Sequence, residues 1–189
     1  MTEFETLPIE RLSGEGCAET GADARAFCLG VIQQVYGIAY HPDWHADLDS
    51  LALAAADSWF SNENRGAFFL VRNLQGQIMA TGGLYDLARK PNTASRLAQR
   101  YGEGENVCQI VRVYLDASVR RMGLGSRIVR VLENEAKTLN YSAAYLHADA
   151  QTAGTLRFWR DSGYREFDRF SYPSPTGTDT SVDFDKLLA

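Results

Sequence analysis

The sequence predicts a single domain of the α/β class, and three observations predict it. Strand-like apolar runs alternate along the chain with runs of helical periodicity. The 189 residues, 45% of them apolar, suffice for one domain with a full core, whereas a second domain would be cramped. Between a strand-like run and a strongly helical run lies a basic turn with two glycines, at residues 120–126.

The N-terminal half is expected to form three strands and two helices. In order, these are a strand over 4–12, a helix over 22–38, a helix over 47–60, and strands over 67–71 and 77–84. Asn73–Gly76 has the composition of a hairpin turn. Asp47 is expected to cap the second helix. The first helix is predicted to bury one stripe of residues: Phe27, Val31, Gln34, Val35 and Ile38.

The C-terminal half is expected to contain the strand and the helix on either side of the basic turn. The run 107–115 is apolar enough for a buried strand, and 123–139 has helical periodicity. The predicted inward face of this helix consists of Ile128, Val129, Leu132, Ala136 and Leu139. Two further strands are expected near 164–170 and 180–187, on either side of a loop at 172–177.

Residues 87–101 form a longer connection than a hairpin needs. The basic residues in this segment are Arg89, Lys90, Arg96 and Arg100. Three interpretations stay open: a lid over a substrate site, a surface that docks something acidic, and a solvated helical insertion.

The turn at 120–126 has the properties of an anion-binding site. The first N–H groups of a helix have no partner within the helix, and the aligned peptide dipoles place partial positive charge there. Gly123 and Gly125 remove side chains that would hold a phosphate away, and they permit a positive φ. We therefore expect a pyrophosphate to bind at this turn.

Two common phosphate-binding motifs do not fit the turn. A kinase or ATPase loop needs G-x-x-x-x-G-K-[ST], but no Lys-Ser or Lys-Thr follows these glycines. A dinucleotide fingerprint needs a third glycine where Ile128 stands. The pattern that remains is R-x-x-G-x-G, formed by Arg120, Gly123 and Gly125 after an apolar strand.

This pattern resembles the acyl-CoA signature [QR]-x-x-G-x-[GA] of the GNAT superfamily of N-acyltransferases. Members typically carry a strand similar to R-L-Y-V-D before the signature, and residues 112–116 here are Arg-Val-Tyr-Leu-Asp. Members then have a further strand, a helix containing F-Y, and G-F at the start of another strand. The counterparts are residues 144–148, Phe158-Trp159 and Gly163-Tyr164. The resemblance is dense over 107–170 and diffuse over the rest of the chain.

The resemblance implies one domain over residues 1–189, with a twisted mixed sheet whose fourth and fifth strands splay apart and about four flanking helices. The pantetheine arm of acyl-CoA would enter between these strands and face main-chain groups of Val113, Tyr114 and Leu115. The Leu115 N–H would be the oxyanion donor, and the Ser126 hydroxyl would add a donor at the helix start. The pyrophosphate would lie against Arg120, Arg121, Met122, Gly123, Leu124, Gly125 and Ser126.

The chain departs from the family pattern at two positions that matter for chemistry. The tyrosine often proposed as proton donor to the leaving thiolate is Trp159 here, and the acidic residue often found early in the signature strand is Gln109. Neither side chain can take up a proton. A lysine-like amine has a pKa of ~10.4, so presenting it neutral at pH 7 costs about 4.6 kcal/mol. Another base, or a less basic acceptor, is therefore required.

His147 and Asp86 are the candidate catalytic side chains. His147 follows the signature helix on the next strand, and imidazole is the natural base near neutral pH. Asp86 lies just past Tyr85 and is placed to reach the acceptor end of the sheet. Each also has a structural interpretation, as a hydrogen-bonded strand histidine and as a turn-forming aspartate. The remaining candidates are Glu103, Glu105 and Tyr145.

The segment His41-Pro42-Asp43-Trp44-His45 invites a metal interpretation because its histidines are four residues apart. Pro42 and the lack of an H-E-x-x-H helix argue against zinc, so no metal is expected. By the resemblance this loop borders the acceptor site, and Trp44 or Tyr40 would shape it.

Composition restricts the partners and the compartment. A net charge of −5 argues against general nucleic-acid binding and is compatible with a cationic acceptor. The chain has no run of 18 apolar residues, so no membrane span is predicted. The first residues lack signal-peptide features, and we therefore expect a cytoplasmic protein. Three scattered cysteines indicate a reducing compartment, with Cys28 and Cys108 packed as small apolar residues.

Two functions are compatible with these features. The first is an acetyl-CoA-dependent N-acetyltransferase, a monomer or homodimer that acts on a primary amine of a small molecule or a protein. The second is an acyl-CoA-binding sensor or interaction module of the same fold with little catalysis, which Gln109 and Trp159 favour. Both need the turn that contains Arg120, Gly123 and Gly125.

Overall fold

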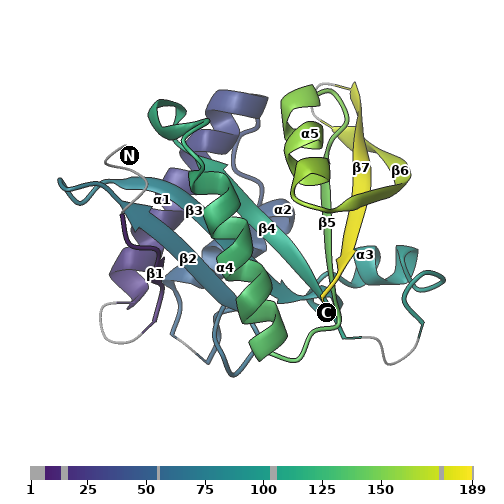
Figure 1. Ribbon diagram of the computed structural model, residues 1–189, viewed down its shortest axis with the longest axis horizontal. Helices are drawn as coiled ribbons and strands as arrows, with labels where there is room; N and C mark the ends of the chain where they lie inside the picture. The colour runs from purple at the N-terminus through teal and green to yellow at the C-terminus, as the bar shows by residue number, and fades with distance from the viewer. Residues whose placement is uncertain (1–6, 14–16, 55, 103–105, 175–176, 189) are drawn as a thin grey trace.

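A computed structural model describes residues 7–13, 17–54, 56–102, 106–174 and 177–188. Its centre is a seven-stranded sheet of order β1-β2-β3-β4-β5-β7-β6 (Figure 1). The strands are β1 (Glu10–Arg11), β2 (Ala67–Arg72), β3 (Ile78–Asp86), β4 (Val107–Leu115), β5 (Ala143–Asp149), β6 (Arg165–Ser174) and β7 (Gly177–Leu187). The helices are α1 (Cys17–Tyr36), α2 (Pro42–Asp49), α3 (Pro91–Arg96), α4 (Leu124–Thr138) and α5 (Ala153–Asp161). The predicted mixed α/β fold is confirmed.

Helices cover both faces of the sheet. In Figure 1, α4 lies across one face of β2, β3 and β4, whereas α1 and α2 lie behind them. The inward face predicted for α4 is confirmed: Ile128, Val129, Leu132 and Ala136 are buried, and Leu139 packs at the edge of the same core. α5 packs against β5 and β6.

The stripe predicted for α1 is only partly confirmed: Phe27 and Ile38 pack against the core, but this stripe is not the most buried face of the helix. Its buried residues are Ala24, Cys28 and Ile32, whereas Val35 of the predicted stripe is 44% exposed. The reason is the close approach of the helix to the chain that follows α2: a Cβ on Gly21 would lie 1.8 Å from the Leu51 carbonyl oxygen. Small residues therefore face inward, and the larger apolar ones lie along the flanks.

The second predicted helix, 47–60, is wrong in its bounds. α2 begins at Pro42, which occupies the first turn where a missing N–H costs nothing, and Asp47 lies inside the helix instead of capping it. A single 3₁₀ turn, Ser50–Ala52, follows. The Ser50 hydroxyl donates to the Asp47 carbonyl at 2.7 Å and accepts the Trp59 N–H at 3.1 Å, so the chain folds back at this point.

The other strand predictions agree more closely with the structure. The hairpin at Asn73–Gly76 is confirmed, because the Asn73 N–H donates to the Gln77 carbonyl at 2.9 Å and Gly76 has a φ of 80°. Of the strand expected over 4–12, the structure describes residues 7–12, and only Glu10 and Arg11 pair with β2. The two C-terminal strands pair along a hairpin that reaches Ser174 and Gly177.

β4 and β5 are the parallel pair at the centre of the sheet, and they separate soon after they meet. Their pairing is restricted to Val107 with Ala143, Cys108 with Ala144, and Gln109 with Tyr145. β4 nevertheless continues to Leu115 and β5 to Asp149. We call the unpaired stretches, β4 beyond Gln109 and β5 beyond Tyr145, the splay. The predicted divergence of the fourth and fifth strands is thus confirmed.

Cys28 and Cys108 are free and fully buried, as predicted. Within the described ranges, no helix has the length and apolarity needed to cross a bilayer. In the same part of the chain, no three His, Cys, Asp or Glu side chains converge as metal ligands.

Candidate acyl-CoA and acceptor site

A β-bulge shapes β4 where it borders the splay. Arg112 has a φ of 55°, and the register with β3 shifts so that Arg112 and Val113 together face Gly82. A Cβ on Gly82 would lie 2.5 Å from the Ile128 Cγ2 atom, so glycine is needed where α4 presses on this bulge.

The ladder to β3 determines which main-chain groups of β4 face the splay. The Asp116 N–H donates to the Met79 carbonyl at 2.8 Å, and Tyr114 is paired with Thr81 in the same register. Because hydrogen-bonded and outward-facing residues alternate along an antiparallel strand, the main chain of Tyr114 faces β3. The N–H and C=O groups of Val113 and Leu115 therefore point toward β5.

The resemblance implied that the main chain of Tyr114 faces the pantetheine, whereas in the structure it faces β3. The half-buried ring of Tyr114 packs with the apolar residues between the sheet and α1. The outward Leu115 carbonyl is approached by the Arg120 Nε atom at 3.4 Å, which links the end of β4 to the basic turn.

The basic turn ends in a helix start with free donors. Gly123 is the N-cap of α4 in the left-handed region, with a φ of 76° and no side-chain cap. The first helical bond runs from the Arg127 N–H to the Gly123 carbonyl at 3.1 Å. The N–H groups of Leu124, Gly125 and Ser126 consequently have no acceptor within the helix. A Cβ on Gly123 would meet nothing within 4 Å, so the surface over these donors is open.

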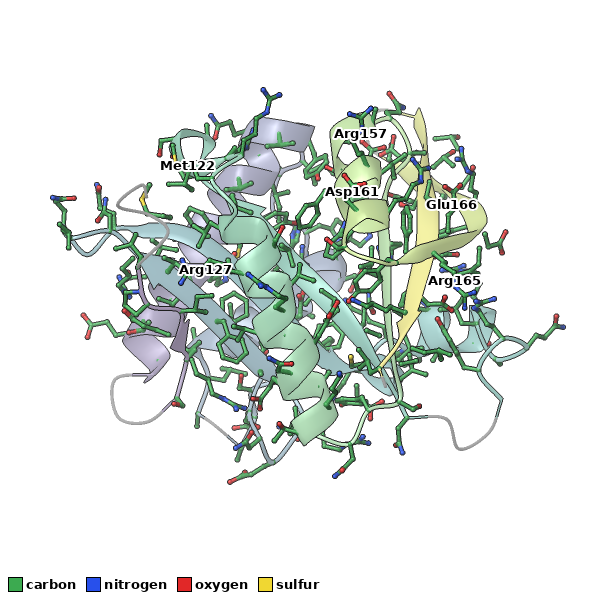
Figure 2. The ribbon with its side chains drawn as sticks, viewed as in Figure 1. Met122, Arg127, Arg157, Asp161, Arg165 and Glu166 are labelled. Atoms are coloured by element: carbon green, nitrogen blue, oxygen red, sulfur yellow. The ribbon has the colours of Figure 1, made fainter. Side chains whose placement is uncertain are left out.

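The same end of the molecule carries further positive charge. Arg121 has a φ of 64°, the conformation of a tight turn, and is exposed beside Arg120. Figure 2 shows Met122 at this turn and Arg157 on α5 at the same end of the structure. Free helix N–H groups, the dipole of α4 and these guanidinium groups together favour a bound diphosphate.

Gly125 also lies where two helices pack closely. A Cβ there would lie 3.4 Å from two ring atoms of Phe158 and 3.6 Å from the Leu115 Cδ1 atom. These are ordinary van der Waals distances, so one methyl group fits but a larger side chain would push α5 away. Gly125 thus determines how closely α4 and α5 pack beside the end of β4.

His147 lies on β5 two residues beyond the last β4–β5 pair, and its ring is exposed. Its Nδ1 atom is 3.2 Å from the Tyr145 hydroxyl. Tyr145, which is fully buried, donates its proton to the Asp183 Oδ1 atom at 2.6 Å and accepts from the Arg96 Nη2 atom at 2.9 Å. The hydroxyl has one proton, which Asp183 receives, so Nδ1 of His147 must be the donor to Tyr145.

Surrounding groups keep the His147 imidazole neutral. Although part of the residue reaches solvent, the packing of its ring beside Tyr145 and Phe170 desolvates it and lowers the pKa of His147. The guanidinium groups of Arg96 and Arg112 together with Lys90 lower the pKa further. The carboxylate of Asp183 acts in the opposite direction but does not outweigh them. With Nδ1 protonated, the lone pair of a neutral His147 is on Nε2, which is the arrangement a general base needs.

Asp86 is not brought to this place. It pairs with Cys108 at the beginning of β4. Cys108 lies seven positions before Leu115, so the two ends of this stretch of β4 are roughly 20 Å apart at ~3.3 Å per strand residue. Its Oδ1 atom caps the next turn by accepting the Ala88 N–H at 3.0 Å, and its Oδ2 atom binds the Arg65 guanidinium at 3.1 Å. These bonds match the structural interpretation of Asp86 as a turn-forming aspartate.

The other candidate bases are Tyr145, Glu103 and Glu105. Tyr145 has its hydroxyl fully engaged, and burial raises its pKa far above the ordinary range. Glu103 and Glu105 lie outside the described residues.

The two positions that depart from the family pattern differ from each other. Trp159 is 6% exposed, and its ring packs edge-on against Phe158 at 5.0 Å and Tyr164 at 5.2 Å, so it is a core residue. Gln109 is 4% exposed and stands where β4 and β5 part. Within the described part of the chain its Oε1 atom has no hydrogen-bond partner, which leaves a buried acceptor at the root of the splay.

A buried ion pair that sequence reasoning missed holds α2 against the bulge. The Arg112 Nε and Nη2 atoms donate to the two carboxylate oxygens of Asp47 at 2.8 and 2.7 Å, and Nη2 also donates to the Trp44 carbonyl at 2.8 Å. Burial alone would raise the pKa of Asp47, but the Arg112 charge and hydrogen bonds hold it below its ordinary value. The loop predicted to border the acceptor site is thereby fixed to β4.

The two histidines of that loop have a structural explanation. The His41 N–H donates to the His45 Nδ1 atom at 2.9 Å, and the His41 ring stacks on Trp44 with centroids 5.0 Å apart. His45 is buried, and desolvation together with Arg112 lowers its pKa. Tyr40 is 48% exposed and donates to Asp49 at 2.8 Å.

Comparison with known proteins agrees with this geometry. The model of the acetyltransferase (GNAT) family matches residues 32–164. No curated protein is similar enough in sequence to match the chain. Among solved structures, a GNAT acetyltransferase from Staphylococcus aureus Mu50 has a TM-score of 0.68 at 18% identity, over 97% of this chain and 100% of that one.

Two further structures share the fold. Arabidopsis thaliana NAA60, in complex with a bisubstrate analogue, has a TM-score of 0.69 at 12% identity and coverage of 96% and 98%. The ribosomal-protein-S18-alanine N-acetyltransferase of Escherichia coli has a TM-score of 0.62 at 14% identity and coverage of 96% and 94%. The family match spans most of the chain and includes the helix start described above. This chain therefore belongs to the GNAT family of acetyltransferases, with acetyl-CoA as its co-substrate.

Proposed function

We propose that the enzyme transfers the acetyl group of acetyl-CoA to a primary amine of a small molecule or a protein, by direct attack in a ternary complex, with His147 as general base. The observation that carries this proposal is the hydrogen-bond state of His147. Its Nδ1 atom is bound to Tyr145, its ring is exposed, and it stands on the splay just beyond the last pair of β4 and β5.

Residues on β4 and at the start of α4 fit the co-substrate. The free N–H groups of Leu124, Gly125 and Ser126 would bind the diphosphate, and the open surface at Gly123 allows its close approach. The outward main chain of Val113 and Leu115 would pair with the pantetheine amides. Leu115 N–H would donate to the thioester oxygen, with Val113 N–H as the neighbouring donor. Acetyl-CoA supplies the activated carbonyl carbon.

The residues present can complete the proton transfers without a tyrosine at position 159. As the amine nitrogen bonds to the carbonyl carbon, His147 Nε2 would take one proton from it. The carbon–sulfur bond then breaks and the sulfur leaves with the electron pair. A thiol has a pKa near ~8.5, so the thiolate is a weak enough base to leave without a dedicated acid. The thiolate then takes a proton from solvent, and the His147 imidazolium returns the amine's proton to solvent.

The alternative function, an acyl-CoA-binding sensor with little catalysis, keeps one specific observation in its favour. Gln109 and Trp159 replace the two residues that the family often uses for proton transfer, and Trp159 is packed in the core. Under this alternative His147 would be a structural histidine held by Tyr145.

One experiment separates the two functions. Free thiol released from acetyl-CoA is measured across small amines, peptides and aminoglycosides, with wild type and His147→Gln. We expect turnover of at least one amine and a fall in kcat of ~10²-fold or more in the variant, since general base catalysis contributes ~10²–10⁴-fold. CoA affinity by calorimetry should not change. Tight binding without turnover of any acceptor would instead favour the sensor.

A further inference from the structure

We propose that the insertion at residues 87–101 positions the base: Arg96 sets the direction of the hydrogen-bond chain from Asp183 through Tyr145 to His147, and so keeps the Nε2 atom of His147 free to accept a proton. This inference rests on the proposed function of His147. Arg96 itself acts through other residues and is therefore a positioning residue.

Arg96 contacts two members of this hydrogen-bond chain directly, and it contacts a ring that packs against the third. It binds both carboxylate oxygens of Asp183, which is completely buried, and the Nη2–Oδ1 distance is 2.9 Å. The same nitrogen donates to the Tyr145 hydroxyl at 2.9 Å. Its guanidinium carbon lies 3.8 Å from the ring centroid of Phe170, and Phe170 in turn meets the His147 ring edge-on at 5.6 Å.

The direction of the chain follows from the number of protons available. An ionised carboxylate only accepts, and an arginine only donates. With Arg96 bound to it, Asp183 remains an ionised acceptor, so it takes the single proton of Tyr145 at 2.6 Å. The oxygen of Tyr145 is then left with lone pairs alone, and His147 must present an N–H from Nδ1.

Removal of Arg96 should reverse this direction. Asp183 would be left buried without a cation, and a carboxylate in that situation takes up a proton instead of remaining charged. The protonated acid would donate to the Tyr145 oxygen, and the Tyr145 hydroxyl would turn to the Nδ1 atom of His147. The imidazole would then carry its proton on Nε2, where an amine would meet a donor in place of a base.

The chain contains a matched control for this experiment. Arg100, in the same insertion, binds Asp185 at 2.6 Å, and Tyr101 donates to the same Asp185 oxygen at 3.2 Å. The Arg100 guanidinium carbon lies 3.7 Å from the Phe167 ring centroid. Arg100 thus has the same kinds of partner as Arg96 (an aspartate of β7, a tyrosine and an aromatic of β6) but anchors the insertion away from His147.

The decisive measurement is the tautomer of His147, from two-dimensional ¹⁵N NMR of the imidazole side chains near pH 7. The chain has three histidines, so His147→Gln assigns the signal. Wild type should show the proton on Nδ1. Arg96→Met should move it to Nε2, Arg96→Lys should largely preserve the wild-type state, and Arg100→Met should leave it unchanged.

The activity measurement is kept separate. Arg96→Met should lower kcat for the acceptor amine by ~10²-fold, as expected for loss of a general base, with little effect on the KM for acetyl-CoA. Arg100→Met should keep the wild-type kcat. If no amine is turned over at all, the proposed function fails, whereas the NMR result still decides the inference on Arg96.

Two results would overturn the inference: an Arg96→Met protein that retains the Nδ1 tautomer, or an Arg100→Met protein that loses it equally. Should Arg96→Met fail to fold, Tyr145→Phe provides the second variant, because it removes one hydroxyl and leaves the pair of Arg96 and Asp183 intact. His147 then lacks the acceptor for its Nδ1 proton, so a single Nδ1 tautomer in this variant would also contradict the proposed chain.

Discussion

The buried pair of Asp47 and Arg112 gives the sharpest stability prediction. We consider Asp47→Asn, which keeps the shape of the side chain and removes its charge. The side chain of Asp47 is 0% exposed and that of Arg112 is 15% exposed, and two charged hydrogen bonds of 2.7 and 2.8 Å join them. The variant would leave the Arg112 guanidinium buried without a counter-charge.

The expected loss of stability follows from this burial. Removing one partner of a buried, hydrogen-bonded ion pair costs about 3–5 kcal/mol. For a chain of this length, 1 kcal/mol corresponds to ~2–4 °C in Tm, so thermal unfolding should move down by about 10 °C. Asp49→Asn is the matched control on the same helix: its pair with Arg25 is 35% and 32% exposed, and such surface pairs contribute ~0–1 kcal/mol.

The pH dependence provides an internal check on the cause. The folded-state pKa of Asp47 is depressed by Arg112, so the carboxylate stabilises the protein above its unfolded pKa of ~3.9, and this contribution is lost as the pH falls through the lower folded value. The difference between wild type and Asp47→Asn should therefore be largest near neutral pH and shrink below about pH 4. Equal effects of Asp47→Asn and Asp49→Asn on urea or thermal unfolding would refute this account.

Three further predictions concern the site itself. Gly125→Ala should retain CoA affinity by calorimetry because its Cβ meets Phe158 at 3.4 Å, whereas Gly125→Val should weaken it about tenfold or more through overpacking that costs ~1–3 kcal/mol. Trp159→Phe should lower Tm but keep most of the single-turnover rate, since Trp159 is packed in the core, and a hundredfold slower chemical step would contradict this assignment. The rate should fall at acid pH as His147 becomes protonated. Because the folded pKa of His147 is lowered, this fall should occur below its ordinary pKa of ~6.5. A fall in rate that begins above that value would exclude His147 as the base.

Local patterns in the sequence are sufficient to predict the elements of the proposed co-substrate site. The strand 107–115, the turn at Gly123 and the inward face of α4 were predictable because a continuous apolar run, a glycine with positive φ and helical periodicity are properties of neighbouring residues. The first two helices were harder. Their bounds and faces depend on the close approach at Gly21 and on the hydroxyl of Ser50, which are contacts between segments.

The candidate catalytic side chains are harder to distinguish from the sequence alone. The sequence offers His147 on one strand and Asp86 just past Tyr85 as titratable candidates, and only the register separates them, since Asp86 pairs at the beginning of β4. The acidic partners of the basic insertion could not be identified either. Arg96 and Arg100 do bind acidic groups, but these groups are Asp183 and Asp185, more than eighty positions later in the same chain.

The splay explains why both ion pairs lie in the same part of the molecule. Beyond Gln109 and Tyr145 the strands have no ladder between them, so no main-chain hydrogen bonds join their two facing edges. On the β4 side, Arg112 ties the edge to α2 through Asp47.

On the β5 side, Arg96 ties Tyr145 and Asp183 to the insertion. Each edge is therefore paired on its far side with a neighbouring strand and also held by an ion pair to a connecting segment. Connecting segments change length and composition more freely than strands, so the insertion can alter the proposed base without disturbing the turn proposed to bind acetyl-CoA. We accordingly expect exchange of residues 87–101 to change kcat and acceptor preference while CoA affinity stays constant, and a parallel loss of CoA affinity would show that the two parts of the site are not independent.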